Sequence, residues 1–136
     1  MVFPLDFARF TEYTMRVGEV EVVSRGVMSK TLPALMLAPA TTYYLPDTYA
    51  RVSEWKEVMV KVLPLVNNIH SFWIEETADG ENFFPVEGLI NTAPSANTWN
   101  KIKTDDLLNY IRVAVRTLDS PNPVPATLVI VLEVRR

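Results

Sequence analysis

Proline most strongly limits what this chain can fold into. The 136 residues include ten prolines, most of which fall in four short segments: "LAPATTYYLPD", "VLPLVNN", "NTAPSANTWN" and "DSPNPVPA". Proline removes a backbone donor and clashes with the preceding helical turn, so these segments are predicted loops that no long helix can cross. The best helical candidate is a single turn at residues 104–110, which Thr104 could cap.

Between the loops, apolar and polar residues alternate with period two, as in strands that bury one face. In the clearest run, Ile111, Val113 and Val115 face one way, whereas the nearly continuous β-branched run at the C-terminus favours a central strand. The predicted strands lie within residues 12–24, 54–66, 70–77, 109–118 and 126–136. The sequence therefore predicts an all-β fold, an antiparallel, jelly-roll-like β-sandwich of about seven to nine strands with at most one or two short helical turns.

The length suits one domain. Residues 1–50 are less regular, and we predict that they form an N-terminal arm and the first strands, with residues 51–136 as the sandwich core. Phe3, Phe7 and Phe10 are large apolar residues close to a chain end, and Tyr43 and Tyr44 add aromatic surface. Two alternatives stay open, because such segments either cover the chain's own core or dock on a neighbouring subunit.

Composition narrows the classes of function. Thirteen basic and sixteen acidic residues give a net charge of -3, which predicts no nucleic-acid partner. The chain has no cysteine, so disulfides, cysteine-bound zinc and thiol nucleophiles are excluded. No apolar stretch is long enough to span a membrane, and Pro4, Asp6 and Arg9 interrupt the first residues, so we expect no membrane partner and no signal peptide.

No residue pattern predicts catalysis, a cofactor or a metal. His70 is the single histidine, and no Gly-x-Ser-x-Gly motif accompanies it. Asp79, Glu81 and Asn82 offer oxygens for calcium but lack the spacing of a calcium-binding loop. With four glycines in the whole chain, no glycine-rich phosphate cradle is present. We therefore expect that this protein is not an enzyme.

Two further groups of residues are candidates for a binding site. Glu75 and Glu76 are adjacent on a predicted strand, so they leave opposite faces and cannot act together as a glycosidase pair. Trp55 and Trp73 lie in predicted strands and suit a core or a sheet face. Trp99 lies in a polar loop, where its ring could stack on a sugar or contact a protein.

The segment "SFWIEETADGENFF" shows a family resemblance. Asp79-Gly80 is a turn signal that predicts consecutive antiparallel strands on either side. The second half of the chain resembles discoidin-like and carbohydrate-binding jelly rolls and small phage head and tail proteins. The shared order is a strand ending in Glu, the pattern "DG-x-x-[WF]-x-x-[VI]", a "Y-[IV]-R-[VI]" strand and an apolar last strand. The resemblance covers about 80 residues up to the C-terminus. The matching residues are Glu76, Asp79, Gly80, Phe83, Val86, Tyr110, Ile111, Arg112 and Val113.

Departures from this pattern favour the phage-type relatives. Extracellular discoidin domains carry a cysteine pair and a secretion signal, neither of which is expected here, and their ligand loops have no match in the first half of this chain. The resemblance implies a non-enzymatic virion structural protein, a capsid decoration (cement) or head–tail accessory protein, made in the host cytoplasm. Its partners would be other virion subunits and itself, as a homo-oligomer. The alternative is a carbohydrate-binding module that uses surface aromatics. The predicted interaction surface is Phe3, Phe7, Phe10, Tyr43, Tyr44 and Trp99.

Overall fold

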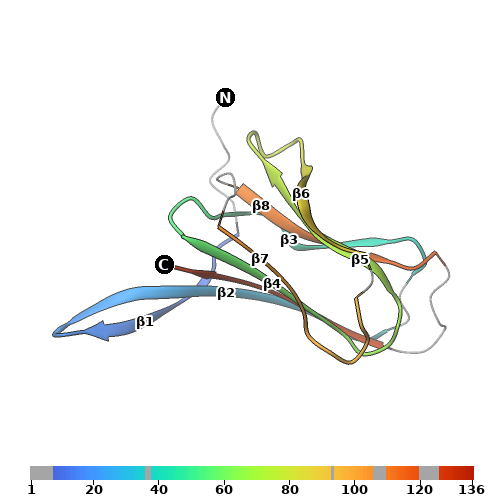
Figure 1. Cartoon of the computed structure of the whole chain (residues 1–136), viewed down its shortest axis with the longest axis horizontal. Coiled ribbons are helices and arrows are strands. Elements are labelled where there is room, and N and C mark those ends of the chain that lie inside the picture. The colour runs from blue at the N-terminus through green and yellow to red at the C-terminus, as the bar shows by residue number, and fades with distance from the viewer. Residues whose placement is uncertain (1–7, 36–37, 93, 106–109, 120–125) are drawn as a thin grey trace.

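A computed structural model describes residues 8–35, 38–92, 94–105, 110–119 and 126–136. These residues form nine strands, and no helix is found among them (Figure 1). The strands are β1 (Thr11–Val17), β2 (Val20–Leu35), β3 (Thr42–Arg51), β4 (Glu57–Pro64), β5 (Ile69–Thr77), β6 (Phe84–Asn91), β7 (Asn100–Thr104), β8 (Tyr110–Thr117) and β9 (Ala126–Arg135).

The strands form two stacked antiparallel sheets. One sheet has five strands in the order β1-β2-β9-β4-β7, and the other has four in the order β3-β8-β5-β6. From β2 onward, every connection except the β5–β6 hairpin passes from one sheet to the other. This winding is that of a jelly roll. The predicted antiparallel sandwich is therefore confirmed.

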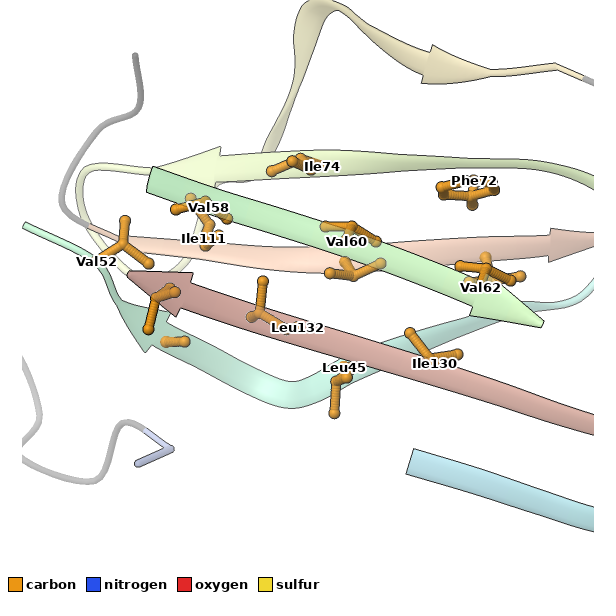
Figure 2. Packing of buried hydrophobic residues seen from close by; sticks show 14 of the residues in the cluster. Leu45, Val52, Val58, Val60, Val62, Phe72, Ile74, Ile111, Ile130 and Leu132 are labelled. Carbon is orange, nitrogen blue, oxygen red and sulfur yellow. The ribbon is translucent and has the colours of Figure 1, made fainter. Parts of the chain in front are cut away.

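The core lies between the two sheets, as the alternation predicts. Val58, Val60 and Val62 on β4 are buried, and so are Phe72 and Ile74 on β5. Figure 2 shows these side chains meeting in the space between the sheets. Further fully buried residues of the core are Ala50, Ile111, Val113, Val115, Leu128, Ile130, Leu132 and Val134. The last strand, β9, lies between β2 and β4, which confirms the predicted central position.

The described residues among the first 50 are more regular than expected. They contain β1, β2 and β3, which belong to the same two sheets as the rest of the chain. Alternation is hard to recognise here because the register shifts between Leu32 and Leu35 on β2, and between Leu45 and Ala50 on β3. Each shift moves the following side chains to the other face, so the period-two pattern is broken.

The predicted helical turn lies mostly outside the described residues. Thr104, its proposed cap, is instead the last residue of β7, and Tyr110 begins β8. Residues 106–109 fall outside the described ranges. Strand β7 itself was not predicted, because its five residues alternate between Asn, Lys and Thr around a single apolar Ile102.

The Asp79-Gly80 turn joins β5 and β6, which pair antiparallel as predicted. Gly80 has a φ of 77°, a conformation that glycine adopts readily. The Asp79 carboxylate accepts backbone N–H groups from Asn82 and Glu81, both at 2.8 Å. These bonds, that to Asn82 first, hold the pKa of Asp79 well below its usual value. Asp79 therefore shapes its own loop.

Candidate functional site

A two-stranded hairpin projects from the sandwich. Residues 11–24, comprising β1, its turn and the first part of β2, are called the arm here (Figure 1). The Arg136 N–H bonds the Ser24 carbonyl at 3.1 Å, and Arg25 is the first residue of β2 that is paired with β9. All seven residues of β1 are exposed. A free two-stranded hairpin is marginally stable in water, so this arm is a candidate for contact with another molecule.

One face of the arm is apolar. The pairs Val17–Val20 and Met15–Val22 place four apolar side chains on that face, and the alternation of β1 adds Tyr13. We call these five residues the arm apolar face. Their exposed fractions run from 40% to 61%. Contiguous exposed apolar surface is typical of a protein contact.

The opposite face of the arm is mostly polar. It presents Glu12, Thr14 and Arg16 from β1, with Glu21 directly across from Arg16. Among the described residues, Glu12 makes no ion pair or hydrogen bond through its side chain, and the Arg16 Nε donates to the Gly18 carbonyl at 3.3 Å. The arm therefore has the pattern of a strand pair that buries its apolar face against other protein and leaves its polar face in water.

A second cluster occupies the outer face of the four-stranded sheet. The Arg112 Nε lies 2.7 Å from the Glu75 Oε1, and the Trp73 Nε1 donates to the Glu75 Oε2 at 3.0 Å. The Arg112 guanidinium lies 4.0 Å from the ring centre of Tyr44 and 3.7 Å from that of Phe83. We call these five residues the Arg112 cluster. It ties β3, β5, β8 and the β5–β6 loop together.

The Arg112 cluster gives a structural role to two residues of the resemblance, because their contacts are made within the chain. Phe83 follows the "DG" turn and Arg112 lies in the "YIRV" strand, and the two stack on each other. Glu75 is paired across the strands with Arg112, whereas Glu76 pairs with the inward-facing Ile111. The two glutamates therefore face opposite ways as predicted.

Glu133 gathers three cations on the outer face of the five-stranded sheet. Its carboxylate oxygens lie 3.3 Å from Arg25, 3.2 Å from Lys61 and 3.5 Å from Arg135. Burial raises the pKa of Glu133, but Lys61 and the two arginines outweigh it and lower the pKa overall. The group is therefore an anion that neutralises a basic patch beside the base of the arm.

A shallow depression of about 550 Å³ lies where the β4–β5, β6–β7 and β8–β9 connections meet. Asn67, His70, Thr92 and Ser95 contribute polar side chains to it. The His70 Nδ1 lies 2.9 Å from the Ser71 Oγ, and no carboxylate bonds the ring within the described part of the chain. The arrangement lacks the third group that orients a catalytic histidine.

The structure separates the residues predicted as an interaction surface. Phe3 and Phe7 lie outside the described residues. Phe10 packs on its own chain, with its ring 6.1 Å from that of Trp55 in an edge-to-face contact. A side chain at Gly26 would lie 2.8 Å from the Phe10 Cβ, so the absence of one lets Phe10 close over β2.

The remaining three residues lie on different parts of the fold. Tyr43 packs against the core, and Tyr44 belongs to the Arg112 cluster on the outer face of its sheet. Trp99 lies on the β6–β7 loop with 43% of its surface exposed. Trp55 is buried, as predicted. The described members of the predicted set thus do not form one surface.

Sequence reasoning missed the arm apolar face. The alternation within residues 12–24 was recognised as strand, but each strand was expected to bury one face. The available signal was the mirror arrangement about the Gly18-Glu19 turn, with Met15 and Val17 before it and Val20 and Val22 after it. The local sequence of a short hairpin does not show which of its faces is buried. That depends on the extent of the neighbouring strands, which is a property of the tertiary structure.

Acidic and histidine side chains do not gather into a group of three or more that could hold a metal ion, as far as the described residues extend. Over the same residues, no helix has the length and apolar character needed to cross a membrane.

The chain matches no protein-family model, and none of the curated proteins matches it. Among solved structures it is similar to the C-terminal CBM6 of LamC, a marine laminarinase from Zobellia galactanivorans. That similarity has 10% identity, covers 96% of this chain and 94% of the other, and has a TM-score of 0.30, which is too low to bear on function.

Proposed function

We propose that this protein is a non-enzymatic structural subunit that acts by associating with other protein subunits, itself included, through its arm. The observation that carries the proposal is the arm apolar face, five exposed apolar side chains on a hairpin that extends past its own sandwich. Burying such a face is favourable by roughly 25 cal/mol per Å². A role in a virion, as a capsid decoration or head–tail accessory protein, is the form of this function that the resemblance of the second half favours.

The contacts elsewhere support a structural role. The charged and aromatic side chains of the Arg112 cluster contact one another, and the Asp79 carboxylate accepts hydrogen bonds from its own loop. The His70 ring bonds the Ser71 hydroxyl, and no carboxylate among the described residues orients it. Among the described residues, the arm instead exposes Met15, Val17 and Val20, which are more than half exposed.

A single charge on the arm apolar face tests the proposal. Val20 is 61% exposed and lies on β2, so Val20→Asp should change the free energy of unfolding by less than about 0.5 kcal/mol. We expect it to weaken self-association at least tenfold, because a carboxylate would have to be desolvated in the contact. Light scattering across a concentration series measures the effect.

The matched control is Leu65→Asp, which places the same charge at another exposed apolar position, 43% exposed and remote from the arm in sequence. It should associate like the unmodified chain. Equal association of the Val20→Asp and unmodified proteins, or a chain that is monomeric throughout, would contradict the proposal.

A carbohydrate-binding module is the second candidate, favoured by the presentation of Trp99. The Asn100 side chain holds the loop before it, accepting the Ser95 N–H at 2.9 Å and donating to the Ser95 and Thr98 carbonyls at 2.9 and 3.0 Å. A half-exposed ring on so fixed a loop suits stacking against a sugar.

Glycan binding by Trp99→Ala decides between the two candidates. If the loop is a sugar platform, the unmodified chain binds a glycan and Trp99→Ala binds it at least tenfold more weakly. Phe84→Ala removes another exposed aromatic ring, 65% exposed on β6, and should leave that binding unchanged. A chain that binds no glycan on an array rules the second candidate out.

A further inference from the structure

Strand β1 is an open sheet edge. It is the terminal strand of the five-stranded sheet, and in the described part of the chain its strand partner is β2 alone. It has seven residues, all exposed, without a proline. An edge strand of this kind presents unpaired backbone groups that another strand can bond, and proteins usually block such edges. At about 3.3 Å per residue, the open edge is about 23 Å long.

The side chains of β1 are complementary to a second copy of β1. In an antiparallel pair centred on Thr14, Glu12 of each strand lies opposite Arg16 of the other. On the opposite face, Tyr13 lies across from Met15, and both belong to the arm apolar face. Opposite charges and aromatic–apolar pairs directly across two strands each stabilise a sheet by about 0.2–1 kcal/mol.

Other arrangements of two β1 strands lose this match. A parallel in-register pair sets Glu12 against Glu12 and Arg16 against Arg16, and like charges directly opposite are destabilising. An antiparallel pair slipped by two residues sets one of the two charges opposite Thr14, which is uncharged. The register centred on Thr14 is the one that satisfies both faces.

The shape of the chain leaves room for this pairing. The arm extends beyond the sandwich, and antiparallel pairing directs the second arm back along the first, so the two sandwiches lie at opposite ends (Figure 1). A two-fold axis through the Thr14 pair relates the copies, as in most homodimers. The two five-stranded sheets then become one continuous sheet.

We propose that two copies of this chain associate through their β1 edges, antiparallel and centred on Thr14, with Glu12 of each copy paired to Arg16 of the other. This inference rests on the proposed function, since it names the partner and the register of the same arm. The two-fold axis makes each charge pair occur twice, so a change at either residue acts twice in the dimer.

Charge reversal tests the register. Arg16→Glu gives a chain with two acidic residues on β1, and Glu12→Arg gives one with two basic residues. Each alone should dimerise at least tenfold more weakly, because like charges then face each other. Mixed in equal amounts, the two variants should form a one-to-one dimer, and the double variant Glu12→Arg/Arg16→Glu should dimerise like the unmodified chain. Sedimentation velocity and native mass spectrometry read these outcomes.

Glu81→Arg is the control, since it reverses an exposed charge on the β5–β6 loop. A second measurement uses the absence of cysteine from the chain. Thr14→Cys places single thiols on the two-fold axis, where opposite Cα atoms are about 4.5–5.5 Å apart, within disulfide range. Oxidation should give a covalent dimer of Thr14→Cys, whereas Ser53→Cys, which changes an exposed residue after β3, should give no covalent dimer.

The outcomes separate this inference from the proposed function. Suppose that Val20→Asp abolishes association, but the mixture of Arg16→Glu and Glu12→Arg does not dimerise and Thr14→Cys does not cross-link. The β1 register is then wrong, and the arm still mediates association. If the unmodified chain is monomeric at every concentration, both are wrong.

Discussion

Phe72→Ala is expected to lower the free energy of unfolding by about 3–5 kcal/mol, because it removes a buried aromatic ring and leaves a cavity between the sheets. Phe72 lies on β5, fully buried, and Figure 2 shows it among the side chains of the core. Its cross-strand partner Val115 is fully buried as well, so the surrounding residues cannot move into the space at low cost. Urea unfolding followed by circular dichroism measures the change.

Phe84→Ala provides the matched control on the neighbouring strand. The same atoms are removed there from a side chain that is 65% exposed, so the free energy of unfolding should change by less than about 0.5 kcal/mol. A loss at Phe84 as large as that at Phe72 would contradict the exposed position of the Phe84 side chain.

Arg112→Ala is expected to cost about 3 kcal/mol of stability. The side chains of Glu75 and Arg112 are only 11% and 18% exposed, so removal of the arginine leaves a nearly buried carboxylate whose remaining side-chain partner is the Trp73 indole. The guanidinium also stacks against Tyr44 and Phe83, and both contacts are lost. Chemical unfolding of Arg112→Ala, Glu75→Ala and the double variant measures the coupling.

The double variant should be about 1–3 kcal/mol more stable than the sum of the two single losses predicts, because it leaves neither Glu75 nor Arg112 as an unpaired charge. Arg116→Ala is the control on the same strand. Its ion pair with Asp119 is exposed, so it should cost no more than about 1 kcal/mol. Additive losses at Glu75 and Arg112 would show that their 2.7 Å contact does not hold in solution.

The sequence predicted the inner half of the sandwich well. Ile111, Val113 and Val115 alternate without interruption, and burial of one face is enough to produce that pattern. The β-branched run of β9 likewise predicted its central place. In both strands the tertiary environment is uniform along the strand, so a local pattern carries the necessary information.

Strands with changing surroundings were harder to predict. On β3 the register shift between Leu45 and Ala50 breaks the period, and on β2 the environment passes from free hairpin to core within one strand. Periodicity assumes one face in water and one in protein, which holds for β4 but not for the arm. The fold class could therefore be predicted, whereas the extent of β2 and the presence of β3 could not.

The candidate site shows the same limit. Phe10 and Tyr43 were placed in the predicted interaction surface because they are aromatic and lie in the less regular first part of the chain, with cover of the chain's own core left open as the alternative. In the structure both pack on that core. Residue type alone does not distinguish an apolar side chain that covers its own sheet from one that reaches another molecule. That difference depends on the surroundings that the tertiary structure gives to each side chain.

Hydrogen–deuterium exchange of the intact chain at low and high concentration tests most directly whether the arm is the surface of association. We predict that the backbone amides of residues 11–17 exchange at least tenfold more slowly at high concentration, while those of the core strands β5 and β8 do not change. Equal exchange of β1 at every concentration, in a sample whose mass shows that it has associated, would contradict the account.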